Sequence, residues 1–182
     1  MTDAAESTQA RQMGVGKLIV VLVPVFFALV IGMSVASGLW SAASQQEVTP
    51  APRELAGYHL DQAMSGPQAI AEVSELHGKD IEVKEAWVGH YQGSGTIWAA
   101  RAESEDRAVK LLDKMVKGIG KGRSPFQGLR ELEIEGIPVY TVTDGRQQHF
   151  FYQQADQVVW VAAPRGGEEA FFQAVLDKID SD

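Results

Sequence analysis

Hydrophobic residues are distributed unevenly along the chain, and their longest uninterrupted run is LIVVLVPVFFALVIGMSVASGLW, from Leu18 to Trp40. The run contains no charged residue. As a helix rising about 1.5 Å per residue it would extend about 34 Å, enough to cross a hydrocarbon core of about 30 Å. The pattern predicts a transmembrane helix over residues 17–40. A cleaved signal peptide is the alternative, because Ser-Ala-Ala at 41–43 offers a cleavage site, but the run exceeds the roughly 7–15 apolar residues of such a peptide.

The charges that flank this run predict its orientation. Arg11 and Lys17 precede it, whereas Arg53 is the cation that follows it within a similar distance. Because cytoplasmic flanks carry the excess of Lys and Arg, we expect the N-terminus in the cytoplasm and the C-terminal domain outside it, in the periplasm of a bacterial cell. The chain then divides into a cytoplasmic tail (1–16), the transmembrane helix (17–40), a linker rich in Ser, Ala, Gln and Pro (41–54) and an extracytoplasmic domain (55–182).

Small residues recur along one side of the predicted transmembrane helix. Ala28, Gly32 and Ala36 are spaced by four residues, a row that lets two membrane helices approach closely. Small residues are also frequent in membrane helices generally, so chance composition is the alternative. We expect this row to pack against another membrane helix, from a second copy of the chain or from a larger membrane protein.

Beyond the linker, the period of the apolar residues predicts strands and helices. A period of two predicts strands, and apolar residues every three to four positions predict helices that begin at Pro67, after Ser104 and near Gly167. The strands are expected at residues 81–91, 96–102, 129–136, 137–143, 147–152 and 157–163. This order predicts an α+β domain with a largely antiparallel sheet and with helices packed on one face.

Two segments of this domain resemble each other. The sequences WAA at 98–100 and WVA at 160–162 lie 62 residues apart, and each belongs to a predicted strand that precedes a helix. One interpretation is a duplication that gives two ferredoxin-like strand–strand–helix halves. The other is that two strand–helix units independently need similar residues at similar spacing.

The composition narrows the range of functions. The chain has no cysteine, which removes disulfides, thiolate nucleophiles, zinc–thiolate sites and iron–sulfur clusters. Its formal net charge of -8 disfavours wholesale binding of nucleic acid. No GxSxG, HExxH or HxH motif occurs. We therefore predict no catalytic residues, no metal site and no cofactor, and expect surface or hydrogen-bonded histidines. Bis-histidine haem ligation is the alternative for the four histidines, His59, His77, His90 and His149.

The segment KGIGKGRSPF, from Lys117 to Phe126, has alternate glycines and interleaved cations, as a phosphate-binding loop would. Such a loop requires GxxxxGK[ST] between a strand and the N-terminus of a helix, where backbone N–H groups point at the anion. Here the glycines follow a helix, and the C-terminal end of a helix repels anions. We interpret Gly118 as the residue that ends the helix and the remainder as a flexible connection.

The helix before these glycines carries a row of cations spaced by three, four and three residues, namely Arg107, Lys110, Lys114 and Lys117. This spacing places the cations on one face and the apolar residues on another. Residues 107–130 have a net charge of +6, although residues 55–182 together have a net charge of -7. A solvated helix face is one interpretation. The other is a strip that docks an acidic partner or anionic headgroups.

These observations favour a non-enzymatic single-pass membrane protein whose outer domain acts as an accessory or assembly subunit of a larger membrane complex. The expected partners are the lipid bilayer and a membrane protein or second copy bound through the transmembrane helix, with no nucleic acid. The alternative is an extracytoplasmic binding or sensor module for a small ligand such as haem or a lipid.

Overall fold

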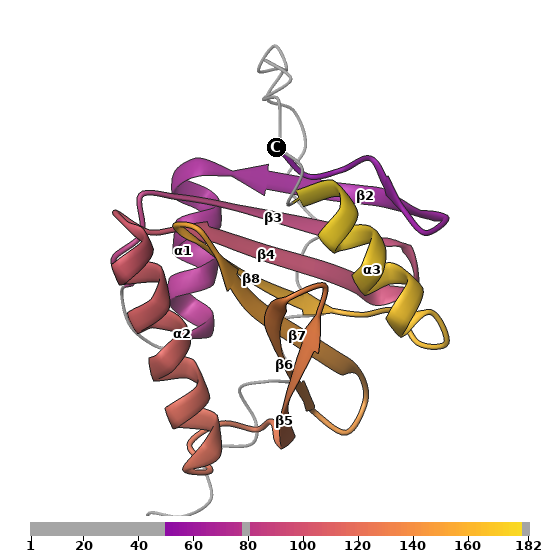
Figure 1. Cartoon of the computed structure of the whole chain (residues 1–182). Coiled ribbons are helices and arrows are strands. Elements are labelled where there is room, and N and C mark those ends of the chain that lie inside the picture. Colours follow the sequence, from indigo (N-terminus) through magenta and orange to yellow (C-terminus); the bar gives the residue numbers. More distant parts are fainter. Residues whose placement is uncertain (1–49, 78–80, 180–182) are drawn as a thin grey trace, which may run out of the picture. The chain divides into compact units, whose positions relative to one another are not determined.

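The computed structural model describes residues 50–77 and 81–179 (Figure 1). The predicted cytoplasmic tail, the transmembrane helix and residues 41–49 of the linker lie outside these residues. In the part of the chain that is described, no helix is long and apolar enough to cross a membrane. The transmembrane helix therefore stays a prediction, and the described structure is that of the domain alone.

One eight-stranded antiparallel sheet and three helices make up the described domain, which confirms the α+β class. The strands are β1 (Glu54–Leu55), β2 (Tyr58–Ser65), β3 (Glu85–Tyr91), β4 (Gly95–Arg101), β5 (Gln127–Ile134), β6 (Ile137–Thr143), β7 (Gln148–Gln154) and β8 (Gln157–Ala162). The helices are α1 (Gly66–Leu76), α2 (Glu105–Gly120) and α3 (Glu168–Ile179), with a short 3₁₀ turn, η1 (Gln92–Ser94), between β3 and β4. The strands lie in the order β1-β2-β3-β4-β8-β7-β6-β5.

The middle of the sheet is the antiparallel pair of β4 and β8. Trp98 lies directly opposite Trp160, and Ile97 lies opposite Val161. On the outer sides, β4 forms a hairpin with β3 and β8 forms a hairpin with β7. The two hairpins are therefore related by an approximate two-fold axis that runs perpendicular to the sheet and between the two tryptophans. This arrangement agrees with the strand part of the predicted repeat.

Helices cover both faces of the central strands, so the prediction of helices on one face is wrong. Ile97 and Val161 belong to the core cluster that α3 completes. On the opposite face, Trp98 packs with α1 and Val158 packs with α2. Figure 1 shows α3 in front of the sheet and α1 behind it. The physical reason is that β8 is apolar on both of its faces, and a single helical layer would leave one of them exposed to water.

The helices also break the two-fold relation between the hairpins. Helix α2 follows β4 and lies against β7 and β8, whereas α3 follows β8 and lies on the other face of the sheet. An axis perpendicular to the sheet keeps the two faces distinct, so a complete repeat would place α2 and α3 on the same face. Helix α1 instead covers β3 and β4, where the counterpart of α2 would lie. The resemblance of the two halves therefore stops at the hairpins.

The largest buried cluster lies between α3 and the sheet. The ring of Phe172 stacks on that of Phe150 with 4.4 Å between centroids, and Phe171 meets Tyr91 edge to face at 5.4 Å. The Tyr91 hydroxyl donates to the carbonyl oxygen of Pro52 at 2.9 Å. Burial raises the pKa of Tyr91, so its hydroxyl stays protonated and remains a donor. The chain before β1 is thereby tied to the core under α3.

Strands β1 and β2 are absent from the predicted elements. The sequence of β2, YHLDQAMS, has no clean period of two, yet residues Leu60 to Ser65 pair with β3. Ala51 is buried, so residues that composition assigns to the linker pack with the domain. Tertiary pairing decides this strand, since the local pattern alone does not specify it.

The outer strand β5 carries its acidic residues on one face. Glu131 lies opposite Tyr140 and shares the α2 side of the sheet with Glu133, whereas Arg130 and Leu132 face the other side. All four β5 residues are exposed, and no described strand pairs with the outer edge of β5. Charged side chains on an edge strand hinder its pairing with another chain.

We expect Phe171→Ala to lower the free energy of unfolding by about 3–5 kcal/mol, because it removes a fully buried ring that contacts two tyrosines. The measurement is a urea titration of the detergent-solubilised full chain. Glu169→Gln, on the exposed side of the same helix, is the control and should change the free energy of unfolding by less than about 1 kcal/mol. Equal effects of the two substitutions would show that α3 does not hold the core.

Candidate functional site

Helix α2 presents the cations that the sequence singles out, and its start is fixed by a local cap. Ser104 is the N-cap, and its hydroxyl accepts from the backbone N–H of Arg107 at 3.4 Å. Glu105 and Asp106 occupy the first turn, where negative charge complements the helix dipole. The predicted start of this helix after Ser104 is therefore confirmed.

The end of α2 lies further along the chain than the glycine pattern predicts. Gly118 and Gly120 lie inside the helix, and the residue that ends it in the left-handed region is Gly122, with φ of 67°. The Gly122 N–H donates to the Ile119 carbonyl at 2.9 Å, and the Arg123 N–H donates to the Gly118 carbonyl at 3.1 Å. These two bonds form a Schellman motif. The amides that an anion would need thus donate to helix carbonyls, so the segment closes a helix and forms no phosphate cradle.

The basic face of α2 consists of Arg107, Lys110, Lys114 and Lys117, all of them exposed. Arg107 pairs with Glu82 at 3.0 Å and Lys117 pairs with Asp113 at 3.3 Å. Such exposed ion pairs contribute about 0–1 kcal/mol each, so a partner can displace them at little cost. Lys110 and Lys114 have no ion pair with any described residue. The middle of the basic face is therefore free to meet an acidic group.

The apolar side of α2 holds this face in place. Leu111 and Met115 pack against Ala102 and Val158, and the C-terminal half packs against β6 and β7 through Ile119. A rigid helix loses little further conformational entropy on binding, which favours it as a docking element. The predicted small-residue row of the transmembrane helix, Ala28, Gly32 and Ala36, lies outside the described residues and stays a prediction.

The four histidines lie apart. His59 faces Glu54 at 3.3 Å, His77 bonds the Val73 carbonyl, and His90 contacts the Thr96 hydroxyl at 3.3 Å. Among residues 50–77 and 81–179, no three His, Asp or Glu side chains come together as a metal site would require. The fourth, His149, belongs to a polar network around the turn between β6 and β7.

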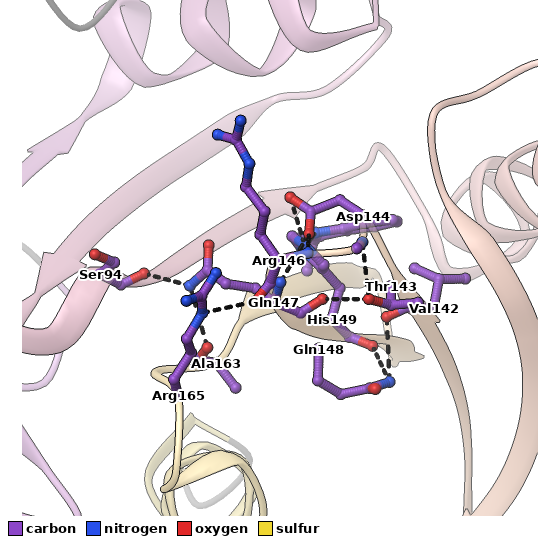
Figure 2. A network of polar contacts seen from close by, with 12 residues as sticks. Ser94, Val142, Thr143, Asp144, Arg146, Gln147, Gln148, His149, Ala163 and Arg165 are labelled. Atoms are coloured by element: carbon purple, nitrogen blue, oxygen red, sulfur yellow. Dashed lines mark hydrogen bonds and ion pairs between the residues drawn. The ribbon is translucent and has the colours of Figure 1, made fainter.

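Asp144 organises this turn (Figure 2). Its carboxylate accepts from the backbone N–H groups of Arg146 at 2.7 Å and Gln147 at 2.8 Å. The Thr143 hydroxyl donates to the Gln147 carbonyl at 2.9 Å and accepts from the Gly145 N–H at 3.0 Å. Burial would raise the pKa of Asp144, but these backbone bonds and the nearby His149 outweigh it, and the pKa lies below its ordinary value. The carboxylate is therefore charged and fixed in position.

Three further hydrogen bonds anchor the turn to the rest of the domain. The Gln147 side-chain amide donates to the carbonyl oxygens of Ser94 at 2.9 Å and Ala163 at 3.2 Å. The Arg165 side chain donates to the Arg146 carbonyl at 2.7 Å. Figure 2 shows these residues converging from three connections of the chain. The β6–β7 turn is thereby connected to η1 and to the segment that leads into α3.

His149 lies beside this turn with only 6% of its surface exposed. Its Nδ1 accepts from the indole N–H of Trp160 at 3.1 Å, and its Nε2 lies 3.7 Å from the Asp144 carboxylate. Phe126 packs against both the imidazole and the indole, with 4.9 Å between ring centroids in each case. Burial lowers the pKa of His149, and the Asp144 charge offsets only part of that shift.

Sequence reasoning finds the basic face but misses the His149 cluster. The partners of His149 come from the β6–β7 turn, from β8 and from the loop after α2, and no local spacing connects them. The pairing of β7 with β8, which places His149 near Trp160, is what brings them together. Comparison with protein families, with curated proteins and with solved structures gave no match.

We expect the free energy of unfolding to fall as the pH drops below about 6.5, the ordinary pKa of histidine. The pKa of His149 is lower in the folded state than in the unfolded state, so the unfolded state gains the proton first as the pH falls. The loss of stability is complete once the pH lies below the pKa of the folded state. Urea titrations between about pH 7.5 and 5.0 should show a smaller loss for His149→Gln than for the wild type. Parallel pH profiles of the two proteins would contradict the assignment to His149.

Proposed function

We propose that this chain is a non-enzymatic single-pass membrane protein whose outer domain serves as an accessory or assembly subunit of a larger membrane complex. The observation that carries the proposal is the basic face of α2. Its cations lie on a rigid helix, point away from the sheet and include two lysines with no ion pair among the described residues. The partner surface that fits this face is acidic.

The distribution of charge supports a specific contact. Residues 107–130 carry seven cations and one anion, within a domain that is acidic as a whole. A uniformly acidic domain would be repelled by an acidic partner from every direction. A single concentrated positive region instead orients the approach and suppresses other binding modes.

The short predicted linker holds the domain near the membrane, where it meets a membrane-bound partner. Ten residues separate Trp40, the end of the predicted transmembrane helix, from Ala51, the first buried residue of the domain. Fully extended, they reach no more than about 36 Å. A domain held this close encounters the outer parts of neighbouring membrane proteins at a high effective concentration, so a modest electrostatic contact suffices for association.

Reversing the two unpaired lysines, Lys110→Glu/Lys114→Glu, should weaken association with co-purifying membrane subunits about tenfold at low salt. Attraction becomes repulsion at two exposed positions, each contributing about 0.7 kcal/mol. The loss should shrink as salt rises, because exposed charges are screened over about 8 Å at physiological ionic strength. The measurement is mass spectrometry of the subunits that the full chain retains in mild detergent, at two salt concentrations.

The matched control is Arg53→Glu/Lys178→Glu, which makes the same change in net charge. Arg53 precedes β1 and Lys178 lies near the end of α3, so both are exposed and remote from α2. This control should retain the subunits as the wild type does. Wild-type retention by the lysine variant at low salt, or equal losses in both variants, would overturn docking through α2.

The predicted transmembrane row provides a separate test. Gly32→Leu should insert normally but lose self-association or a co-purifying membrane partner, because it adds bulk where two backbones approach. Ser34→Leu adds similar bulk on the opposite side of the helix and should leave association unchanged. Cross-linking in membranes, at matched protein levels, measures both. Unchanged cross-linking of Gly32→Leu would mean that this row faces lipid.

A further inference from the structure

We propose that His149 and Trp160 form a proton-operated contact, in which protonation of the imidazole breaks its hydrogen bond with the indole and loosens the loop that Phe126 anchors. The contact itself stands independently of the function proposed above. Only its effect on docking, through the cations of that loop, rests on that function.

The first step is the tautomer of neutral His149. The indole N–H of Trp160 can only donate, so Nδ1 of His149 must accept and carries no hydrogen. The single imidazole hydrogen of the neutral ring therefore sits on Nε2. That atom is buried and has no hydrogen-bond partner among the described residues, because the Asp144 oxygen at 3.7 Å is too distant.

Protonation reverses both relations. A hydrogen added to Nδ1 points at the indole hydrogen of Trp160, and two donors 3.1 Å apart repel each other. On the other side, the now positive ring is attracted to the Asp144 carboxylate, which lies just beyond hydrogen-bonding distance. The protonated ring is thus pushed from Trp160 and pulled towards Asp144.

The surroundings determine which group moves. Asp144 is held by two backbone N–H groups, so the carboxylate stays in place and the imidazole shifts. The neighbours of His149 on the adjoining strands are Val142 of β6 and Ala162 of β8, neither of them charged. Phe126, from the loop after α2, is likewise uncharged. Among the described residues, Asp144 is the charged group that acts on the ring.

The output of this movement is the position of Phe126. Its half-buried ring rests on both His149 and Trp160, and it anchors the loop between the end of α2 and the start of β5. When the rings of His149 and Trp160 separate, Phe126 loses the contact with one of them. Lys121 and Arg123 lie in the same loop, next to the basic face of α2.

The direct test is a pH titration followed by nuclear magnetic resonance on the detergent-solubilised full chain, with ¹⁵N-labelled tryptophan and histidine. The Trp160 indole signal, identified by its loss in Trp160→Phe, should shift with the same midpoint as the His149 imidazole. Trp98 is an internal control, because its indole donates to Glu72 at 2.8 Å and should not follow His149.

Two variants test separately the hydrogen bond of His149 with Trp160 and its attraction to Asp144. Trp160→Phe keeps an aromatic ring but removes the donor, so His149 should bind its proton about fivefold more tightly, the equivalent of a hydrogen bond of about 1 kcal/mol. Asp144→Asn removes the attracting charge and should weaken proton binding. An indole signal that ignores the titration of His149, or unchanged proton binding in Trp160→Phe, would overturn the proposal. If either variant fails to fold, the wild-type titration decides alone.

The chain has no cysteine, so a single introduced thiol reports on the loop. A nitroxide label at Arg123→Cys should become more mobile through the pH range in which His149 titrates, and His149→Gln should abolish that change. A label at Lys178→Cys, near the end of α3, is the control and should not respond. Constant mobility at Arg123→Cys while His149 titrates would show that the loop is not coupled to the contact.

Discussion

The antiparallel pairing of β4 with β8 is the constraint on which the rest of the domain depends. It joins two hairpins that are distant in sequence, and it places Trp98 opposite Trp160 at the centre of the sheet. Because both strands are apolar on both faces, each face must be covered. Helices α1 and α2 divide one face between them and α3 covers the other, so the described helices meet the need of this pair for cover on both faces.

Much of the domain follows from the period of its apolar residues. Strands β3 to β8 and all three described helices lie close to where alternation, caps and turn residues predict them. The pattern does not predict where the helices pack, because QVVWVAA indicates a buried strand without showing which helix covers which face. The pattern does not predict strand β2 for a related reason, because YHLDQAMS becomes a strand only through its pairing with β3. Local pattern predicts elements, and tertiary pairing decides their arrangement.

The two sites differ in how far sequence can reach. The basic face of α2 is a matter of helical spacing and is visible in one segment of the chain. The environment of His149 assembles from the β6–β7 turn, from Trp160 and from Phe126, which are brought together only by the sheet and by the loop after α2. An isolated histidine in a strand gives no indication of such partners. The structure thus adds a buried polar contact next to a surface that composition already marks as unusual.

The acidic outer strand β5 has a consequence for the behaviour of the protein at high concentration. If two copies joined through their β5 edges in antiparallel fashion, a two-fold axis perpendicular to the sheet would relate them. The same face of the sheet would then continue from one copy into the other. In the registers that place Glu131 of one copy opposite Glu131 or Glu133 of the other, carboxylates face each other and repel. Arg130 and Leu132, on the opposite face, cannot relieve this clash. Among the described strands, the acidic outer edge of β5 therefore disfavours this edge-to-edge pairing of two copies.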